Sequence, residues 1–362
     1  MKSDELIEVT KAMKLEILDI ILNANLSSDK EAQLTILTID DMFERLGLKV
    51  EEVIPEDTLR SYFKGVDEAT KALSAAGINP IGGLGASIST SGQVASAFAT
   101  QVHMNAIAEI TDNTMLDLKA AIRTAQQNTY FTLMTTLQDV KEDLQKGVIQ
   151  GKARRVITQR VSESFAKEGM TSFITIDGKR LPLDFYSETV VRTNIKMAHT
   201  KGAGERYREN GMDLFTVTGG TPTCHQCAPL RGIVFTLNPD RKDYTYMNPR
   251  DIIRHPNCNC SMSVWVEEYK TESEIKKAQR ESKAFNPDKD TRSKSQKEAY
   301  EEQQRLHRIN NYDKKRYAEM LSILGEERMP KGIGAFKRMK RSNSDNYKKL
   351  LQDYQDALKA IK

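Results

Sequence analysis

The sequence of 362 residues lacks any run of 18 or more apolar residues, and its mean hydropathy is −0.55. A helix that crosses a bilayer needs such a run, so we expect no stable membrane span. The first residues lack the basic start and the apolar core of a secretory signal, which predicts folding in a reducing cytoplasm. The Gly82–Gly85 stretch lacks the Gly-Lys-Ser/Thr of a phosphate-binding loop. This absence argues against an ATPase or a kinase.

Cysteine is also scarce, and its four residues all lie in one window of 37 residues, from Cys224 to Cys260. Buried free cysteines scatter along a chain, and disulfides need an oxidising compartment. The Cys-x-x-Cys pair with a second group further along the chain is typical of a zinc site. The sequence therefore predicts bound Zn²⁺, with five candidate ligands: Cys224, Cys227, Cys258, Cys260 and His255.

Two ligand sets satisfy this spacing. The four thiolates form one set, with His255 as a spare; the other set takes in His255 and Cys258 and leaves Cys260 outside. We favour the four thiolates. A site closed by four thiolates has no open position for water, so we expect the ion to stabilise the fold and not to react.

The remaining pattern predicts an α+β protein that is mainly helical. Amphipathic helices are expected over the first 70 residues, with a break at Pro55, and helical periodicity resumes from Val94 to about Gln145. Residues 74–108 contain no charged side chain at all. We interpret them as an interface loop that leads into a helix; the alternative is a mobile segment that reaches a membrane or a channel wall.

The centre of the chain carries the strand signals. Gly147–Gly151 interrupts the helical pattern, and Asp177-Gly178 predicts a tight hairpin turn within Phe173–Leu181. A helix is expected from Tyr186 to about Asn210, followed by strands at 213–218 and 233–237. We therefore predict three parts: a helical region at 1–145, a small β-containing module stapled by zinc at 146–266, and a basic helical arm at 267–362.

Charge is distributed unevenly along the chain. Residues 1–60 carry 7 basic and 14 acidic groups, whereas residues 271–362 carry 23 basic and 15 acidic groups. A basic arm of this kind is typical either of a polyanion contact or of a solvated helical surface. The candidate nucleic-acid contacts are Lys314, Lys315, Arg316, Lys337, Arg338, Lys340 and Arg341.

Several short motifs, taken in order, carry a family resemblance. They are Gly147–Lys152, Phe173–Arg180, Tyr186–Thr193, Gly211–Leu214, Cys224–Gly232 and His255–Cys260. In this order they resemble the tailed-phage minor capsid protein 2 and Mu F-like head-morphogenesis family, over about residues 145–266. The last motif of that family usually reads His-Pro-Asn-Cys-Arg-His, so this chain has Cys260 in place of a histidine and Asn259 in place of an arginine. Leu230 stands where the family often has tryptophan.

The resemblance implies a structural virion protein and no catalytic activity. Such a protein would be made in the host cytoplasm, assemble beside the portal protein with other capsid proteins, and possess a DNA contact that suits the basic arm.

Two alternatives remain open. The first is a zinc-dependent nuclease, for which His225, His255, Glu188 and Arg192 are the candidate residues. Glu188 and Arg192 are spaced i, i+4 on one expected helix, which predicts an ordinary surface ion pair. The second is a plain DNA-binding protein with no capsid role, which would depend on the basic arm alone.

Overall fold

The computed structural model describes residues 2–83, 85–146, 153–174, 178–255 and 258–361. Its contacts divide the chain into two compact units, each made of several stretches of sequence. Unit 1 comprises Met1–Ser3, Val50–Asp117 and Glu188–Gln303, and unit 2 comprises Asp4–Lys49, Leu118–Ser187 and Gln304–Lys362. The three predicted parts divide the chain along its sequence, and that division stays a prediction. Its first boundary adjoins residues 147–152, which lie outside the described residues.

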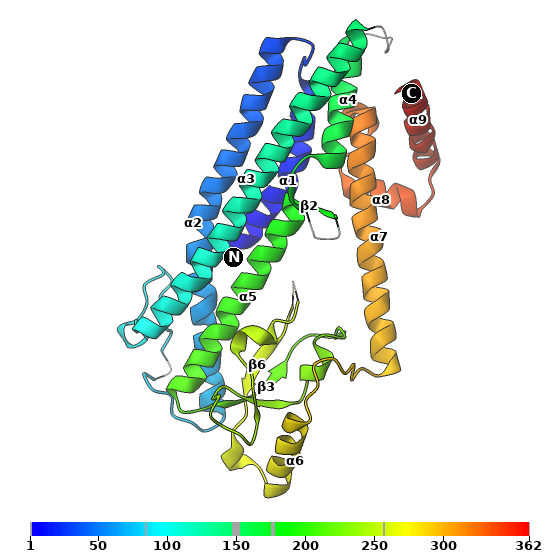
Figure 1. Ribbon diagram of the computed structural model, residues 1–362. Coiled ribbons are helices and arrows are strands. Elements are labelled where there is room, and N and C mark those ends of the chain that lie inside the picture. The colour runs from blue at the N-terminus through cyan, green and yellow to red at the C-terminus, as the bar shows by residue number, and fades with distance from the viewer. Residues whose placement is uncertain (1, 84, 147–152, 175–177, 256–257, 362) are drawn as a thin grey trace. The chain divides into compact units, whose positions relative to one another are not determined.

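Helices make up most of the described chain (Figure 1). The α-helices are α1 (Lys2–Asn23), α2 (Asp29–Ala75), α3 (Gln101–Gln145), α4 (Ala153–Glu168), α5 (Leu183–Glu209), α6 (Glu272–Lys283), α7 (Lys294–Leu324), α8 (Ile333–Arg341) and α9 (Asp345–Ile361). Short 3₁₀ helices are η1 (Ser96–Phe98), η2 (Ala228–Leu230), η3 (Pro249–Ile252), η4 (Glu267–Tyr269) and η5 (Glu326–Arg328). Among the described residues, every helix is too short or too polar to cross a membrane.

The strands form two small sheets. In unit 2, β1 (Thr171–Ile174) pairs antiparallel with β2 (Arg180–Pro182). In unit 1, the order is β5-β4-β3-β6, made of β3 (Leu214–Thr218), β4 (Val234–Thr236), β5 (Thr245–Tyr246) and β6 (Ser261–Val264). Strand β3 is antiparallel to both β4 and β6. The predicted class, mainly helical α+β with a small central sheet and a helical C-terminal region, is confirmed.

Two local predictions have different outcomes. The expected helix break at Pro55 is wrong, because α2 continues through it. Proline costs a helix interior about 3 kcal/mol, but Val53 and Ile54 are buried and their packing outweighs that cost. The predicted hairpin pairing at 173–181 is confirmed by β1 and β2. Its turn residues 175–177, like the predicted interruption at 147–151, lie outside the described residues.

Helices α2 and α5 approach each other closely within unit 1. A Cβ atom built on Gly65 of α2 would lie 2.0 Å from the backbone oxygen of His199, and one on Gly202 of α5 would lie 2.2 Å from that of Tyr62. Real Cβ atoms do not approach oxygen so closely. The two glycines therefore allow the backbones of α2 and α5 to come into contact. This contact positions α5, the helix that precedes β3.

This contact predicts opposite effects for two identical substitutions in α2. Gly65→Ala should destabilise the protein by about 1–3 kcal/mol, because the added methyl group forces the helices apart. Gly47→Ala is the matched control: a Cβ there meets nothing within 4 Å, so the helix should gain about 0.5–1 kcal/mol. Urea unfolding of both variants measures the difference. Equal effects would show that the α2–α5 contact does not limit the packing.

Charged and polar side chains from α2, from α5 and from Asn210, which follows α5, hold the uncharged segment in place within unit 1. Arg206 donates to the Ile81 oxygen at 2.5 Å, and the Asn210 amide oxygen accepts from the Ile81 N–H at 2.7 Å. Asp67 accepts from the Ser87 N–H at 2.9 Å. The following helix begins at Gln101, later than the expected start near Val94. Backbone N–H and C=O groups of the segment thus form hydrogen bonds with side chains from elsewhere in unit 1.

Candidate metal centre

The sheet of unit 1 brings the two halves of the cysteine motif to one end. Thr218, the last residue of β3, lies opposite Ser261, the first residue of β6. The segment after β3 carries Cys224 and Cys227, and the segment before β6 carries His255, Cys258 and Cys260. Antiparallel pairing therefore places both segments at the same edge. Residues 238–254 return the chain to the first pair, so that Cys227 and Cys258 lie 3.5 Å apart at their sulfur atoms.

Short backbone turns hold the donor atoms in place. The Ala228 N–H donates to the Cys224 oxygen at 3.0 Å, and the Cys258 N–H donates to the His255 oxygen at 3.1 Å. All four cysteines are free thiols and are buried, with Cys260 fully inaccessible. They belong to the apolar core that also contains Leu230 and Phe235. Such burial argues that the cluster is a structural feature and not an exposed reactive site.

The distances divide the five candidate ligands into two overlapping groups. Nε2 of His255 lies 3.1 Å from Sγ of Cys224 and 3.3 Å from Sγ of Cys227. Sγ of Cys227 lies 3.5 Å from Sγ of Cys258. Within each group, Cys224 with Cys227 and His255, and Cys227 with Cys258 and Cys260, the donor atoms all lie within 4.8 Å of one another. Cys227 is common to both groups and could contribute to either ligand set.

The donor set fits a zinc ion. Tetrahedral zinc with bonds of about 2.3 Å to sulfur and 2.0 Å to nitrogen sets two sulfurs roughly 3.8 Å apart, and a sulfur and a nitrogen roughly 3.6 Å apart. The spacings of 3.1 to 3.5 Å in this cluster are within a few tenths of these values. Thiolate and imidazole are also the ligand types that zinc prefers. The cluster could therefore hold a metal with only small movements of its side chains.

Crowding makes the thiols titrate together. Hydrogen bonding to Cys258 and Cys260, with burial, raises the pKa of Cys227, whereas hydrogen bonds from Cys227 and Cys260 lower the pKa of Cys258. A bond with Cys227 lowers the pKa of Cys260, but Cys258 and burial outweigh it and raise that pKa to about 11. These three thiols thus hold one negative charge in preference to three. A divalent cation would allow all of them to ionise.

Two basic side chains lie near the cluster, and no motif in the sequence predicts them. Lys196 of α5 donates to the Ser261 hydroxyl at 2.7 Å, next to Cys260. Burial lowers the pKa of Lys196, although the thiolates of Cys258 and Cys260 act in the opposite direction. Arg292 donates to the Thr223 oxygen at 3.4 Å, next to Cys224. The positive charge of Lys196 would partly offset a metal site of net negative charge, such as one ion with four thiolates, whereas Arg292 is already paired with Asp290 at 2.9 Å.

The residues considered for nuclease chemistry differ in their exposure and partners. His225 is exposed, whereas its neighbours Cys224 and Cys227 are buried. Glu188 and Arg192 form the predicted i, i+4 ion pair at 3.0 Å, with half of the Arg192 side chain exposed. That interpretation of the pair is confirmed.

The predicted nucleic-acid contacts all lie in α7 and α8 of unit 2, and they divide into two kinds. Lys340 pairs with Asp313, Lys337 donates to Asn310, and the Arg316 guanidinium lies 4.4 Å from the ring centre of Tyr354. The four exposed members are Lys314, Lys315, Arg338 and Arg341. The exposed four remain available for a partner, while the other three also support the packing of this region.

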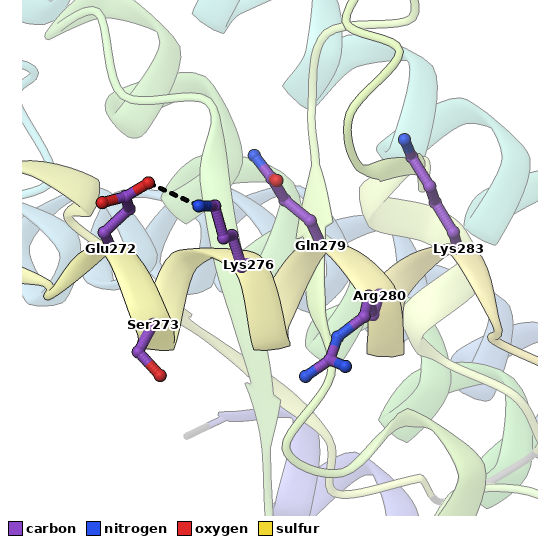
Figure 2. Close-up of a pocket in the computed structure, with 6 residues that line it drawn as sticks. All are labelled: Glu272, Ser273, Lys276, Gln279, Arg280 and Lys283. Carbon is purple, nitrogen blue, oxygen red and sulfur yellow. Dashed lines mark hydrogen bonds and ion pairs between the residues drawn. The ribbon is translucent and has the colours of Figure 1, made fainter.

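A further basic surface lies on α6 in unit 1. Figure 2 shows a groove lined by Glu272, Ser273, Lys276, Gln279, Arg280 and Lys283. Glu272 is paired with Lys276, and Arg280 points away from Lys276 and Lys283 in this view. The six lining residues include no histidine, and their only carboxylate is already paired. This groove is therefore a poor candidate for acid–base catalysis.

Comparison with known families was made on the whole sequence. The sequence model of the family described as phage minor capsid protein 2 matches residues 29–331. The chain belongs to the phage minor capsid protein 2 family. The match extends beyond the motifs at 145–266 and includes most of the helical chain on either side. Comparisons with curated proteins and with solved structures gave no match.

Family membership assigns a coarse function. Minor capsid proteins are structural components of the virion and assemble with other capsid proteins. The cysteine cluster lies within the matched residues, as do α6 and α7.

Proposed function

We propose that the chain is a structural protein of the phage head, bound at the portal, whose cysteine cluster holds one zinc ion as a fixed cross-link. Cys224, Cys227, Cys258 and Cys260 are the proposed ligands, and His255 is the alternative to Cys260. The observation that carries this proposal is the convergence of two distant cysteine pairs at one end of the β3–β6 pair. Zinc bound there would join the segment after β3 to the segment before β6.

Burial and charge support a closed site. The four thiols are at most 7% exposed and belong to an apolar core, so they present almost no surface to a substrate. Four thiolates around Zn²⁺ carry a net charge of about −2, which Lys196 would partly balance. A site with no open ligand position binds no reacting water. The proposal therefore assigns no catalytic role to the ion.

One experiment tests the metal, the nuclease alternative and the portal contact together. The full chain, purified without added metal or chelator, is analysed for zinc, incubated with double-stranded DNA and magnesium, and sedimented with portal rings. We expect one zinc per chain, intact DNA and co-sedimentation. Metal-dependent cleavage would favour the nuclease, and failure to bind portal rings would remove the portal from the proposal.

We also propose that the exposed basic residues of α7 and α8 contact packaged DNA. Lys314, Lys315, Arg338 and Arg341 are exposed, and neutralising a phosphate contributes about 0.9 to the slope of log K against log salt. Replacing all four with glutamine should lower that slope by about 3 to 4 in filter binding. Lys276→Gln with Lys283→Gln on α6 is the matched control. A slope that falls only in the α6 variant would assign the DNA contact to α6.

A further inference from the structure

Unit 2 exposes a face that carries no charge. Residues 124–138 of α3 contain no Asp, Glu, Lys or Arg over 15 positions, and neither do residues 32–39 of α2. At 1.5 Å per residue the α3 stretch is roughly 22 Å long. An exposed helix normally directs charged side chains to water. An exposed helix of about four turns without any charged residue is therefore unusual and calls for an explanation.

The two uncharged stretches lie side by side as an antiparallel pair. Asp29 of α2 pairs with Lys141 of α3 at one end, and the Gln126 amide of α3 contacts Asp40 of α2 at 3.4 Å at the other. The residues between these contacts include 32–39 and most of 124–138. We call their outward side the neutral face. Charged residues at Asp29, Lys141 and Asp40 thus bracket it.

Large apolar side chains occupy the centre of the neutral face. Their exposed fractions are Leu34 54%, Leu37 56%, Tyr130 45%, Phe131 71% and Met134 40%. Exposed but uncharged polar residues lie on the same two stretches: Gln33, Thr38, Gln127, Thr135 and Gln138. Large apolar side chains together with uncharged polar ones are the usual composition of a protein–protein interface. Scattered single apolar residues need no explanation, but five on two paired helices do.

The chemistry of the face decides which class of partner fits. Nucleic acid and anionic lipid both require Lys or Arg, which the two stretches lack. A strongly charged protein would leave its charges unpaired against this surface. The remaining partner is a protein surface that is itself apolar and neutral.

We propose that the neutral face binds the neutral face of a second copy of the chain. A neutral surface meets its own copy without like-charge repulsion, which most charged surfaces cannot do. Two antiparallel helix pairs related by a two-fold axis stack into a four-helix arrangement in which each copy uses the same residues. The five apolar side chains expose roughly 500 Å² in total, and the uncharged polar residues bring each copy toward the roughly 800 Å² of a standard interface.

The test is the oligomeric state of the full chain across a range of concentrations, measured by sedimentation equilibrium. We expect a monomer–dimer equilibrium that Phe131→Glu weakens at least 100-fold, because it buries one carboxylate per copy in the apolar centre. Leu306→Glu is the matched control, since Leu306 is 54% exposed on α7 of the same unit and lies outside the neutral face. This control should dimerise as the wild type does.

Two outcomes would overturn the proposal. One is a wild-type chain that stays monomeric at every concentration, which would leave the face for a different capsid protein. The other is a dimer that Phe131→Glu does not weaken. Phe131 is mostly exposed, so its replacement should leave the fold intact; circular dichroism of both variants checks this. Because the experiment measures neither zinc nor portal binding, its failure is distinguishable from failure of the proposed function.

Discussion

Cys227→Ser is expected to release the zinc and unfold the β3–β6 end of unit 1. Cys227 is the residue common to both donor groups, so its loss damages either ligand set. Structural zinc contributes on the order of 10 kcal/mol to the folding of small metal domains. That is comparable with the whole stability of a typical domain, about 5–15 kcal/mol. Elemental analysis should show no bound zinc, and hydrogen exchange should show loss of protection at residues 214–218 and 261–264.

His225→Gln is the matched control for this prediction. His225 lies beside Cys224 but is exposed, so the variant should keep both its zinc and its protection. A well-folded Cys227→Ser protein, together with a wild type that contains no metal, would show that thiol packing alone holds the cluster. Zinc that stays bound to Cys227→Ser would show instead that the ion uses another set of ligands.

Elemental analysis for zinc also distinguishes the two ligand sets. If four thiolates bind the ion, Cys260→Ser should lose affinity and His255→Gln should keep it; the opposite result assigns the fourth position to His255. Cobalt substituted for zinc gives a second readout, because its visible absorption distinguishes four sulfurs from three sulfurs and one nitrogen. The position of Lys196 favours the set with more negative charge.

The cysteine cluster could be predicted because its signal is local. Cys-x-x-Cys and His-Pro-Asn-Cys-Asn-Cys each fit one short turn, and strand signals on either side predict how the turns meet. The positions of Lys196 and Arg292 could not be predicted. Both are many residues away in the sequence and come near the cluster only through the packing of unit 1. Spacing reveals ligands on one turn, but it does not reveal which helix lies behind them.

The helices show the same limit. The predicted helix from Tyr186 to about Asn210 agrees well with α5, because burial repeats along a helix. The prediction at Pro55 was wrong because tertiary packing can outweigh the free-energy cost of a proline within a helix. A single sequence does not reveal that packing. The close contact at Gly65 could not be predicted either. A glycine within a helical pattern indicates only a lower helix propensity, unless the helix that packs against it is known.

Charge counts predicted the basic arm, but they did not predict which of its basic side chains have partners within the protein. Lys340 and Lys337 contact Asp313 and Asn310, which lie about 27 positions earlier in α7. Such pairs depend on how α8 packs against α7. The neutral face is the complementary case: its lack of charge is visible in the sequence, whereas its exposure on two neighbouring helices is not.

A buried polar network in unit 1 gives the second large effect that we expect. Arg206 is 2% exposed, donates to Thr70 Oγ1 at 2.8 Å and lies 4.9 Å from the ring centre of Phe98. It also contacts Glu209 at 3.3 Å. The His103 ring is fully buried between the Tyr62 hydroxyl, at 2.8 Å, and Glu209, at 3.0 Å.

Arg206→Met should destabilise the protein by about 3–5 kcal/mol, because it leaves Glu209 partly buried without its guanidinium and removes the donor to Ile81. Arg192→Met, on the same helix, is the matched control. Its ion pair with Glu188 is half exposed, so that variant should change stability by about 0–1 kcal/mol. Urea unfolding of both variants measures the difference.

The pH dependence of the same two variants isolates the charge from the packing. Burial raises the pKa of Glu209, but His103 and Arg206 outweigh it and hold that pKa below its ordinary value. A carboxyl with a lowered pKa in the folded state adds stability above the pKa of the unfolded chain, and this stability is lost as the pH falls through the folded value. The difference between wild type and Arg206→Met should therefore shrink in acid. A difference that stays constant as Glu209 becomes protonated would assign the effect to the lost packing against Phe98 and the lost hydrogen bonds to Thr70 and Ile81.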